Sequence, residues 1–242
     1  MIEHAVVLAA GRGTRLGALT ADRPKPLLEV GGRALLLRIL DGLVTAGVGD
    51  VTVITGYLGE MVESAVRAAG YPISVEFRHQ ARPDGTARAV GLARDRLDGG
   101  PFFFGWGDIL VDAVNYAAVI DAPEGFDGTL AVNEVDDPWA GAAVEVTADG
   151  VVTRIVEKPP KGTSRTRYNN AGFGVLPPAI WSDIDALEVS ERGEYELPRA
   201  IAAFVERGGG LKAVPVIGRW WDIGTPEDLA AARLHHQQRP AS

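Results

Sequence analysis

The stretch VVLAAGRGTRLGALTADRPKPLL occupies residues 6–28 and joins an apolar run to a glycine-rich loop. The run at 5–10 is short and rich in branched side chains, which predicts a buried β-strand. Gly11 and Gly13 lack a Cβ, so the backbone N–H groups around them can turn toward an anion. Positive side chains follow at Arg12, Arg15 and Lys25. The pattern predicts a phosphate-binding loop after the first strand.

Two familiar phosphate-binding motifs do not fit this loop. A dinucleotide fingerprint needs glycine at its first, third and sixth positions, and the sixth position counted from Gly11 is Leu16. A P-loop needs Gly-Lys followed by Ser or Thr after four spacer residues, and the stretch has none. For Gly11-Arg12-Gly13 alone, an ordinary strand–loop–helix turn with solvated arginines remains the alternative.

The composition limits the classes of protein to consider. The chain has 242 residues, with 46% hydrophobic and 23% charged side chains, which is ordinary for one or two globular domains. No apolar run approaches the length that crosses a bilayer, and Glu3 and His4 precede too short an apolar run for a signal peptide. The absence of cysteine excludes disulfides, thiolate nucleophiles and cysteine zinc sites.

The charge is unevenly distributed along the chain. The formal net charge of −8 disfavours binding to a nucleic acid polymer. Residues 1–40 nevertheless carry six basic and three acidic side chains. A local positive patch on an acidic protein fits a small anionic ligand better than a polymer.

Short apolar strands alternate with amphipathic helices in the first half of the chain, which favours an α/β sheet. We expect strands at 5–10, 51–55, 73–77 and 101–105, and helices near 33–47, 59–69, 86–97 and 112–121. The second half is richer in strands, which we expect at 128–135, 142–147, 151–157, 171–176 and 211–217, with a helix near 197–207. Asp149-Gly150 predicts a hairpin turn, and Thr225-Pro226 predicts the start of a last helix. The sequence predicts one domain whose two parts enclose a cleft.

Two aspartates follow expected strands or precede an expected helix. Asp108 follows the apolar run at 102–104, and Asp222 follows a tryptophan pair. Ligands of open α/β sheets bind beyond the carboxyl ends of the strands, and Mg²⁺ prefers oxygen ligands from one or two carboxylates plus phosphates. A shared magnesium site is one interpretation, and ordinary turn or capping aspartates are the other.

Other polar groups allow a functional and an ordinary reading. Gln80 lies just beyond a strand and Gly85 opens a helix, so the amide could read a nucleobase edge or simply sit exposed in a turn. Glu157-Lys158 ends the hairpin strand, and exposed Glu-Lys pairs usually serve only solubility. Residues and spacing alone leave these alternatives open.

The whole pattern resembles the sugar-phosphate nucleotidylyltransferases, also called nucleotide-sugar pyrophosphorylases. Their signature is roughly Leu-Ala-x-Gly-x-Gly-Thr-Arg-Leu, a spacer and Pro-Lys-Pro, and this chain carries it at 8–16 and 24–26. Gly107-Asp108 and the string Trp-Trp-Asp-Ile-Gly-Thr at 220–225 match the family's two acidic positions, and the resemblance runs from residue 5 to about residue 229. It implies a Rossmann-like domain, a mixed and mostly parallel sheet flanked by helices with a β-rich sugar-binding lobe, over 1–235, followed by a tail at 236–242.

The resemblance also implies roles for individual residues. It implies that Asp108 and Asp222 bind the catalytic Mg²⁺, and that Arg15, Lys25, Asp108 and Lys158 are catalytic. The implied nucleotide site consists of Leu8, Ala10, Gly11, Gly13, Thr14, Arg15, Lys25, Gln80, Gly85 and Thr86. The implied sugar-phosphate site consists of Gly141, Glu157, Lys158, Asn170 and Gly172. This chain has Ala140 where many members have tyrosine, which puts that part of sugar recognition in doubt.

The implied reaction joins an NTP to a sugar 1-phosphate and gives an NDP-sugar and pyrophosphate. We expect a cytoplasmic enzyme without a membrane partner, and homo-oligomerisation stays open. The residues do not name the base or the sugar, although we favour a guanylyl- or uridylyltransferase of polysaccharide supply. A transferase for a non-sugar phosphate acceptor and a catalytically silent nucleotide-sugar-binding subunit are the alternatives.

Overall fold

The computed structural model describes residues 2–121 and 124–237. Its strands are β1 (His4–Ala9), β2 (Glu29–Val30), β3 (Arg33–Ala34), β4 (Asp50–Thr55), β5 (Ser74–His79), β6 (Phe102–Trp106), β7 (Ile109–Val111), β8 (Gly128–Glu134), β9 (Ala142–Val146), β10 (Val152–Glu157), β11 (Tyr168–Leu176), β12 (Leu211–Pro215) and β13 (Trp220–Asp222). Its α-helices are α1 (Leu35–Thr45), α2 (Gly59–Ala69), α3 (Thr86–Gly91), α4 (Arg94–Leu97), α5 (Val114–Ile120), α6 (Ile180–Asp185), α7 (Leu197–Glu206) and α8 (Pro226–Gln237). Three 3₁₀ turns are described, η1 (Thr14–Thr20), η2 (Lys25–Leu27) and η3 (Pro138–Ala140).

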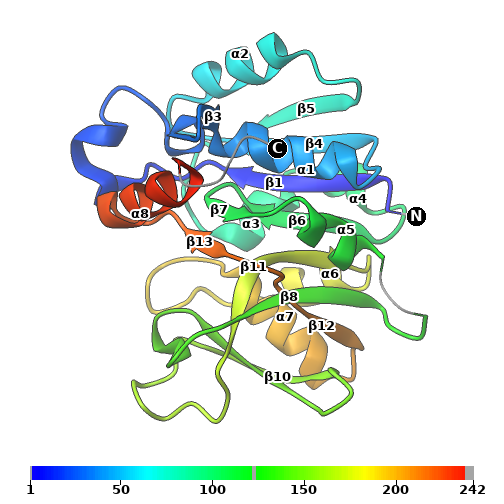
Figure 1. Cartoon of the computed structure of the whole chain (residues 1–242). Coiled ribbons are helices and arrows are strands. Elements are labelled where there is room, and N and C mark those ends of the chain that lie inside the picture. The colour runs from blue at the N-terminus through cyan, green and yellow to red at the C-terminus, as the bar shows by residue number, and fades with distance from the viewer. Residues whose placement is uncertain (1, 122–123, 238–242) are drawn as a thin grey trace.

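One large sheet runs through both parts of the chain. Strands β6, β1, β4 and β5 lie side by side and pair in parallel. β11 pairs antiparallel with β6 and carries the sheet on to β9 and β10 and, separately, to β8 and β12. Figure 1 shows β5, β4, β1 and β6 in the upper part of the molecule and β8, β10 and β12 in the lower part. The expected mixed sheet is confirmed, with parallel pairs from β6 to β5 and a further parallel pair between β8 and β12.

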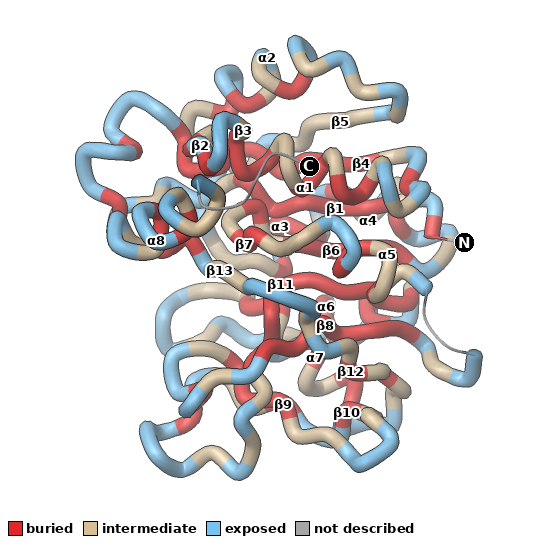
Figure 2. The backbone as a smooth tube through the Cα atoms, viewed as in Figure 1, coloured by how far each residue is buried: buried red, intermediate tan, exposed pale blue. Residues whose placement is uncertain are grey.

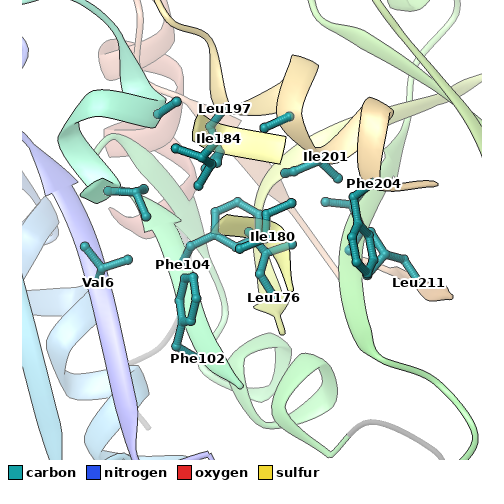
Figure 3. Packing of buried hydrophobic residues seen from close by; sticks show 14 of the residues in the cluster. Val6, Phe102, Phe104, Leu176, Ile180, Ile184, Leu197, Ile201, Phe204 and Leu211 are labelled. Carbon is teal, nitrogen blue, oxygen red and sulfur yellow. The ribbon is translucent and has the colours of Figure 1, made fainter. Parts of the chain in front are cut away.

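Alternating apolar side chains give the sheet two buried faces. On one face Val6, Phe102 and Phe104 pack against α3, α4, α6 and α7, and Figure 3 shows Phe104 beside Ile180 from α6. On the other face Phe103 and its neighbours pack against α1, α2 and α5. Burial therefore concentrates in the central strands, as Figure 2 shows. The result is three layers with the sheet in the middle.

A third, smaller core lies under the last helix. It joins Leu16 of η1 to Leu110 of β7, Ile223 after β13 and Leu229 of α8. Figure 1 shows α8 beside the loop that follows β1. This small core therefore fixes the N-terminal loop against the C-terminal end of the fold.

The structure confirms the expected α/β class and differs from the sequence expectations mainly in short elements. β7, β13 and α6 were not expected, and the helix expected at 86–97 is two helices that separate at Ala93, where the backbone leaves the helical region. The helix expected at 33–47 begins at Leu35 because the preceding residues pair as β3 with β2. The hairpin at Asp149-Gly150 is confirmed between β9 and β10, with Gly150 at a φ of 75°. α8 continues to Gln237, and residues 238–242 of the expected tail lie outside the described residues.

We predict that Thr129→Val lowers the free energy of unfolding by about 2 kcal/mol, because it leaves two buried backbone groups unpaired. Thr129 is fully buried in β8, where its Oγ1 donates to the Val119 carbonyl at 2.7 Å and accepts from the Val175 N–H at 3.2 Å. Urea denaturation measures the change. Thr45→Val, at the exposed end of α1, is the control and is expected to cost less than about 0.5 kcal/mol. An equal loss in the free energy of unfolding for the two variants would contradict this structural role of the Thr129 hydroxyl.

Candidate active site

The loop after β1 is shaped around its glycines and a buried lysine. Gly13 has a φ of 64°, and a Cβ there would lie 3.0 Å from Cβ of Lys25, so glycine permits the two segments to approach. The Thr20 hydroxyl donates to the Gly13 carbonyl at 2.9 Å and closes the turn. Leu16 anchors the loop in the third core, while Arg15 stays exposed. The loop is therefore held from beneath, with a positive side chain on its outer side.

Lys25 is buried and makes an ion pair with Asp108. Only 7% of Lys25 is exposed, and its Nζ lies 2.5 Å from Oδ2 of Asp108. The Gly107 N–H donates to the Leu8 carbonyl at 2.8 Å, and a Cβ on Gly107 would come within 2.8 Å of the same oxygen. That close approach places Asp108 at the carboxyl end of β1. Two residues that the sequence resemblance implied to be catalytic, Lys25 and Asp108, are therefore in contact.

A two-stranded ribbon brings the second carboxylate beside the first. β13 pairs antiparallel with β7, with Asp222 opposite Ile109, and the Ile223 N–H donates to the Asp108 carbonyl at 3.1 Å. Partial enclosure and then the charge of Asp108 raise the pKa of Asp222 above its ordinary range, while Lys25 and Arg15 oppose the shift. Two carboxylates held this close favour a positive charge between them.

Arg15 rests on a glycine next to Asp222. A Cβ on Gly224 would lie 3.0 Å from Nη2 of Arg15, so the guanidinium packs against bare backbone. A reciprocal capping box fixes this turn: the Asp228 N–H donates to Oγ1 of Thr225, and the Thr225 N–H donates to Oδ2 of Asp228 at 2.8 Å. The start of α8 therefore sets the position of Arg15.

These groups open onto a cavity of about 730 Å³ that both parts of the chain line. Predicted site residues along its wall are Arg15, Thr86, Asp108, Gly141, Glu157, Lys158, Asn170, Gly172 and Asp222. Residues that the sequence argument missed line it too, namely Asp137, Asn169, Arg192, Glu194, Glu196 and Trp220 among others. One cavity thus joins the carboxylate pair to the hairpin lysine.

Lys158 has a strained backbone at the end of β10. Its φ is 46°, a left-handed conformation that residues other than glycine adopt rarely, and its N–H donates to the Gly141 carbonyl at 2.7 Å. Beside it, Arg192 reaches Glu157 at 3.5 Å and Glu196 at 2.5 Å. Burial and then the charge of Glu196 raise the pKa of Glu157, whereas Lys158 and Arg192 lower it. This end of the cavity holds two carboxylates and two cations.

Buried amides complete the wall. Oδ1 of Asn169 accepts from the Ala142 N–H at 3.1 Å, and a Cβ on Gly141 would lie only 2.0 Å from that oxygen. Oδ1 of Asn170 accepts from the Gly172 N–H at 2.9 Å. Adjacent asparagines in an otherwise apolar strand were the available signal for Asn169. They fix the backbone on both sides of the cavity floor.

The segment predicted to meet a nucleobase lies beyond the lining of this cavity. Nε2 of Gln80 donates to the Gly85 carbonyl at 3.1 Å and to Oδ1 of Asp84 at 3.2 Å. Gly85 has a φ of 117°, and a Cβ there would collide with the Tyr195 backbone. Thr86 alone of this predicted set lines the cavity, and its Oγ1 accepts from the Leu197 N–H at 2.8 Å.

The remaining predicted nucleotide contacts surround the first loop. Leu8 is buried in the core, and its carbonyl already accepts from Gly107. Gly11 and Thr14 are exposed, and Ala10 is half-buried. Their binding roles stay predictions.

Comparison with known proteins identifies the family of this chain. A family model described as nucleotidyl transferase matches residues 4–239. The chain belongs to the nucleotidyl transferase family.

Among its relatives, this nucleotidyl transferase is 34% identical over 239 residues to the UTP–glucose-1-phosphate uridylyltransferase AglF of Haloferax volcanii, covering 97% of each chain. It is 32% identical to the catalytic subunit beta of mannose-1-phosphate guanylyltransferase of Drosophila pseudoobscura pseudoobscura, with 98% of this chain but 65% of that protein covered.

Solved structures share the fold of this nucleotidyl transferase. A UDP-glucose pyrophosphorylase complexed with UDP-glucose superposes with a TM-score of 0.84 at 18% identity, covering 99% of this chain and all of that one (100%). A Bacillus anthracis protein assigned as a glucose-1-phosphate thymidylyltransferase, crystallised with sucrose, gives 0.85 at 24% identity and covers 99% and 97% of the two chains. At these identities the likeness shows the fold alone.

The described residues were compared with the requirements of a metal site and of a membrane-spanning helix. No group of three or more His, Asp and Glu side chains within 2–121 and 124–237 is arranged to hold a metal ion. A cation bound here would therefore depend on Asp108, Asp222 and the phosphates of a substrate. Over the same residues, no helix combines the length and the apolar character that crossing a bilayer requires.

We predict that Gly224→Ala lowers turnover at least tenfold while the protein stays folded, because the added methyl group would displace the Arg15 guanidinium. The tenfold loss corresponds to about 1.4 kcal/mol of lost stabilisation. Pyrophosphate release at saturating substrates measures it, with thermal unfolding as the check on folding. Gly99→Ala is the control, because a Cβ there meets no atom within 4 Å. Unchanged turnover in Gly224→Ala would contradict a catalytic role for Arg15.

We predict that Glu157→Gln raises the free energy of unfolding at pH 7 and that the gain disappears as the pH falls below about 4.5. The folded protein raises the pKa of Glu157, so the stability linked to this group is present below the unfolded pKa and lost as the pH rises through the folded pKa. Chemical denaturation at pH 4 and pH 7 measures the difference. Glu206→Gln, an exposed site on α7, should show no such pH dependence. A gain of equal size at both pH values would contradict the assignment.

Proposed function

We propose that this nucleotidyl transferase condenses an NTP with a sugar 1-phosphate to give an NDP-sugar and pyrophosphate. The observation that carries the proposal is a single cavity lined by Asp108, Asp222, Arg15 and Lys158. A triphosphate and a sugar phosphate are both anions, and the cavity offers a separate cation for each. The names of the two relatives described above, each a nucleotidyltransferase acting on a sugar 1-phosphate, support it.

The first loop receives the triphosphate in this proposal. Lys25 and Arg15 neutralise the charge that builds on the departing pyrophosphate, together with the backbone N–H groups from Gly11 onward. Lys25 is already held by its ion pair with Asp108, so little rearrangement is needed when the substrate binds. This preorganisation is the main contribution of the loop to catalysis.

The lower part of the cavity receives the sugar phosphate. Lys158 holds the phosphate whose oxygen attacks the α-phosphorus of the NTP in line, and the α–β phosphoanhydride bond breaks as pyrophosphate leaves. Glu157, Asn170 and the bare backbone at Gly141 and Gly172 meet the sugar. No protein side chain forms a covalent bond in this scheme. The strained backbone of Lys158 fits such a role, because strain of this kind collects where a side chain must be aimed.

The carboxylate pair fits a magnesium ion. Asp108 and Asp222 offer oxygen donors only, and burial, followed by the charge of Asp108, raises the pKa of Asp222, a shift that a bound cation would oppose. Mg²⁺ bound there would neutralise charge on the α-phosphate. Lys25 and Arg15 then share the remaining negative charge of the site.

The base and the sugar are the finer part of the proposal. UTP and GTP are the first bases to test, because the named relatives are a uridylyltransferase and a guanylyltransferase. Glucose 1-phosphate and mannose 1-phosphate are the first acceptors, for the same reason. Ala140 leaves the rim of the sugar end open where a tyrosine would otherwise stand.

The test combines each of GTP, UTP, dTTP, CTP and ATP with a set of sugar 1-phosphates in the presence of Mg²⁺ and measures the pyrophosphate released. We expect one pair to dominate and turnover to be lost when EDTA removes the metal. Asp108→Asn should lose most activity while remaining folded, since it removes a metal ligand and the partner of Lys25. The Lys25→Ala variant should lose activity chiefly through a lower turnover number.

The remaining outcomes of this test separate the alternatives. Release of pyrophosphate only with a non-sugar phosphate such as phosphocholine would establish the alternative transferase. Binding of an NDP-sugar without pyrophosphate release from any pair would indicate a silent subunit and overturn the proposal. Full turnover by Asp108→Asn would remove this residue from the metal site.

A further inference from the structure

The connection between β4 and α2 lies against the first loop. Gly56 packs on the backbone of Ala10, since a Cβ on Gly56 would lie 2.5 Å from the Ala10 carbonyl oxygen. Leu58 has a φ of 53°, which is rare for a residue other than glycine. Such tight, strained backbone around Tyr57 aims its side chain at the loop, and Tyr57 belongs to none of the sets discussed so far.

Tyr57 contacts the loop at both of its ends. Its Oη donates to the carbonyl of Ala21, just after η1, at 2.7 Å. The guanidinium carbon of Arg12, just before η1, lies 4.9 Å from the centre of the Tyr57 ring, within the range of a cation–π contact. One side chain from a neighbouring connection therefore bridges the start and the end of the loop.

The two arginines of the loop have different surroundings. Arg15 packs on Gly224 beside the carboxylate pair, whereas Arg12 packs on Tyr57. Apart from Leu16 and Thr20, η1 has no buried residue. The loop consequently depends on few contacts for its order, and those of Tyr57 are among them.

We propose that Tyr57 is a positioning residue that holds the loop at 11–24 in its anion-binding shape before the triphosphate arrives. The inference rests on the function proposed above and adds to it a residue outside the lining of the cavity. An ordered loop loses less conformational entropy on binding than a free one, so preorganisation increases affinity for the triphosphate. Tyr57 thereby increases the affinity for the NTP and leaves the affinity for the sugar phosphate unchanged.

Two substitutions separate the contacts of Tyr57. Tyr57→Phe removes the hydrogen bond to Ala21 and keeps the ring under Arg12, whereas Tyr57→Leu removes both. One hydrogen bond of this kind is expected to change the NTP KM roughly threefold to tenfold. Tyr57→Leu should raise it further. The KM for the sugar 1-phosphate at saturating NTP should change less than about twofold in either variant.

A second readout does not depend on turnover. Hydrogen–deuterium exchange of the amides at 11–24 should be faster in Tyr57→Phe than in the wild type. Isothermal titration with inorganic tripolyphosphate and Mg²⁺ should show weaker binding by a similar factor. Tyr71→Phe is the control, because the Tyr71 hydroxyl also lies 2.8 Å from a backbone carbonyl, that of Leu37, and its other partners, Asp41 and Arg33, lie outside residues 11–24. Its NTP KM and loop exchange should remain at the wild-type level.

The outcomes distinguish this inference from the proposed function. Unchanged loop exchange and an unchanged NTP KM in folded Tyr57→Leu would overturn the role of Tyr57. A fall in thermal stability with equal changes in both KM values would also overturn it, because Tyr57 would then act only on the fold. Absence of pyrophosphate release from the wild type with every pair would instead reject the proposed function, and tripolyphosphate binding and loop exchange would still decide whether Tyr57 orders the loop.

Discussion

The candidate site depends on two carboxylates, Asp108 and Asp222, that line one cavity at one edge of the sheet. The β7–β13 ribbon holds Asp108 and Asp222 together, and like charges at short range raise the free energy of the folded state. Lys25 offsets part of this cost as a buried cation, and Arg15 lies close enough to Asp222 to add to the effect. The fold thus concentrates negative charge where a nucleotidyl transferase would need a cation. Much of the surrounding architecture serves to hold these charges in place.

β11 links this charged edge to the opposite end of the cavity. Its second half pairs with β6, whose end leads to Asp108, while its first half carries Asn169 and Asn170. The hairpin that presents Lys158 pairs with the same end of β11 through β9. Hydrogen-bonded sheet therefore connects the two ends of the cavity. A rigid frame of this kind suits a reaction that depends on positioning two anions.

The sequence predicted the layered α/β architecture and most long elements, because strands such as β4 and helices such as α2 carry clear hydrophobic periodicity. The predicted pair Asp108 and Asp222 lines one cavity, and Lys25 contacts Asp108. β7 and β13 were missed because three residues are too few to display an alternating pattern. Side chains brought in by distant segments, among them Tyr57, Arg192 and Glu196, were missed for a different reason. Their importance lies in tertiary contacts, and nothing in their local sequence records these.

The third core has a consequence for how the protein is made. Leu16 lies near the start of the chain, and its packing partners Ile223 and Leu229 lie near the end. During synthesis the ribosome releases the N-terminal segment first. Leu16 of the first loop can therefore pack against Leu229 only after α8 has been synthesised. A nascent or truncated chain that lacks α8 would carry the signature residues without their support. The first loop would accordingly gain its support only after residues 226–237 have been synthesised.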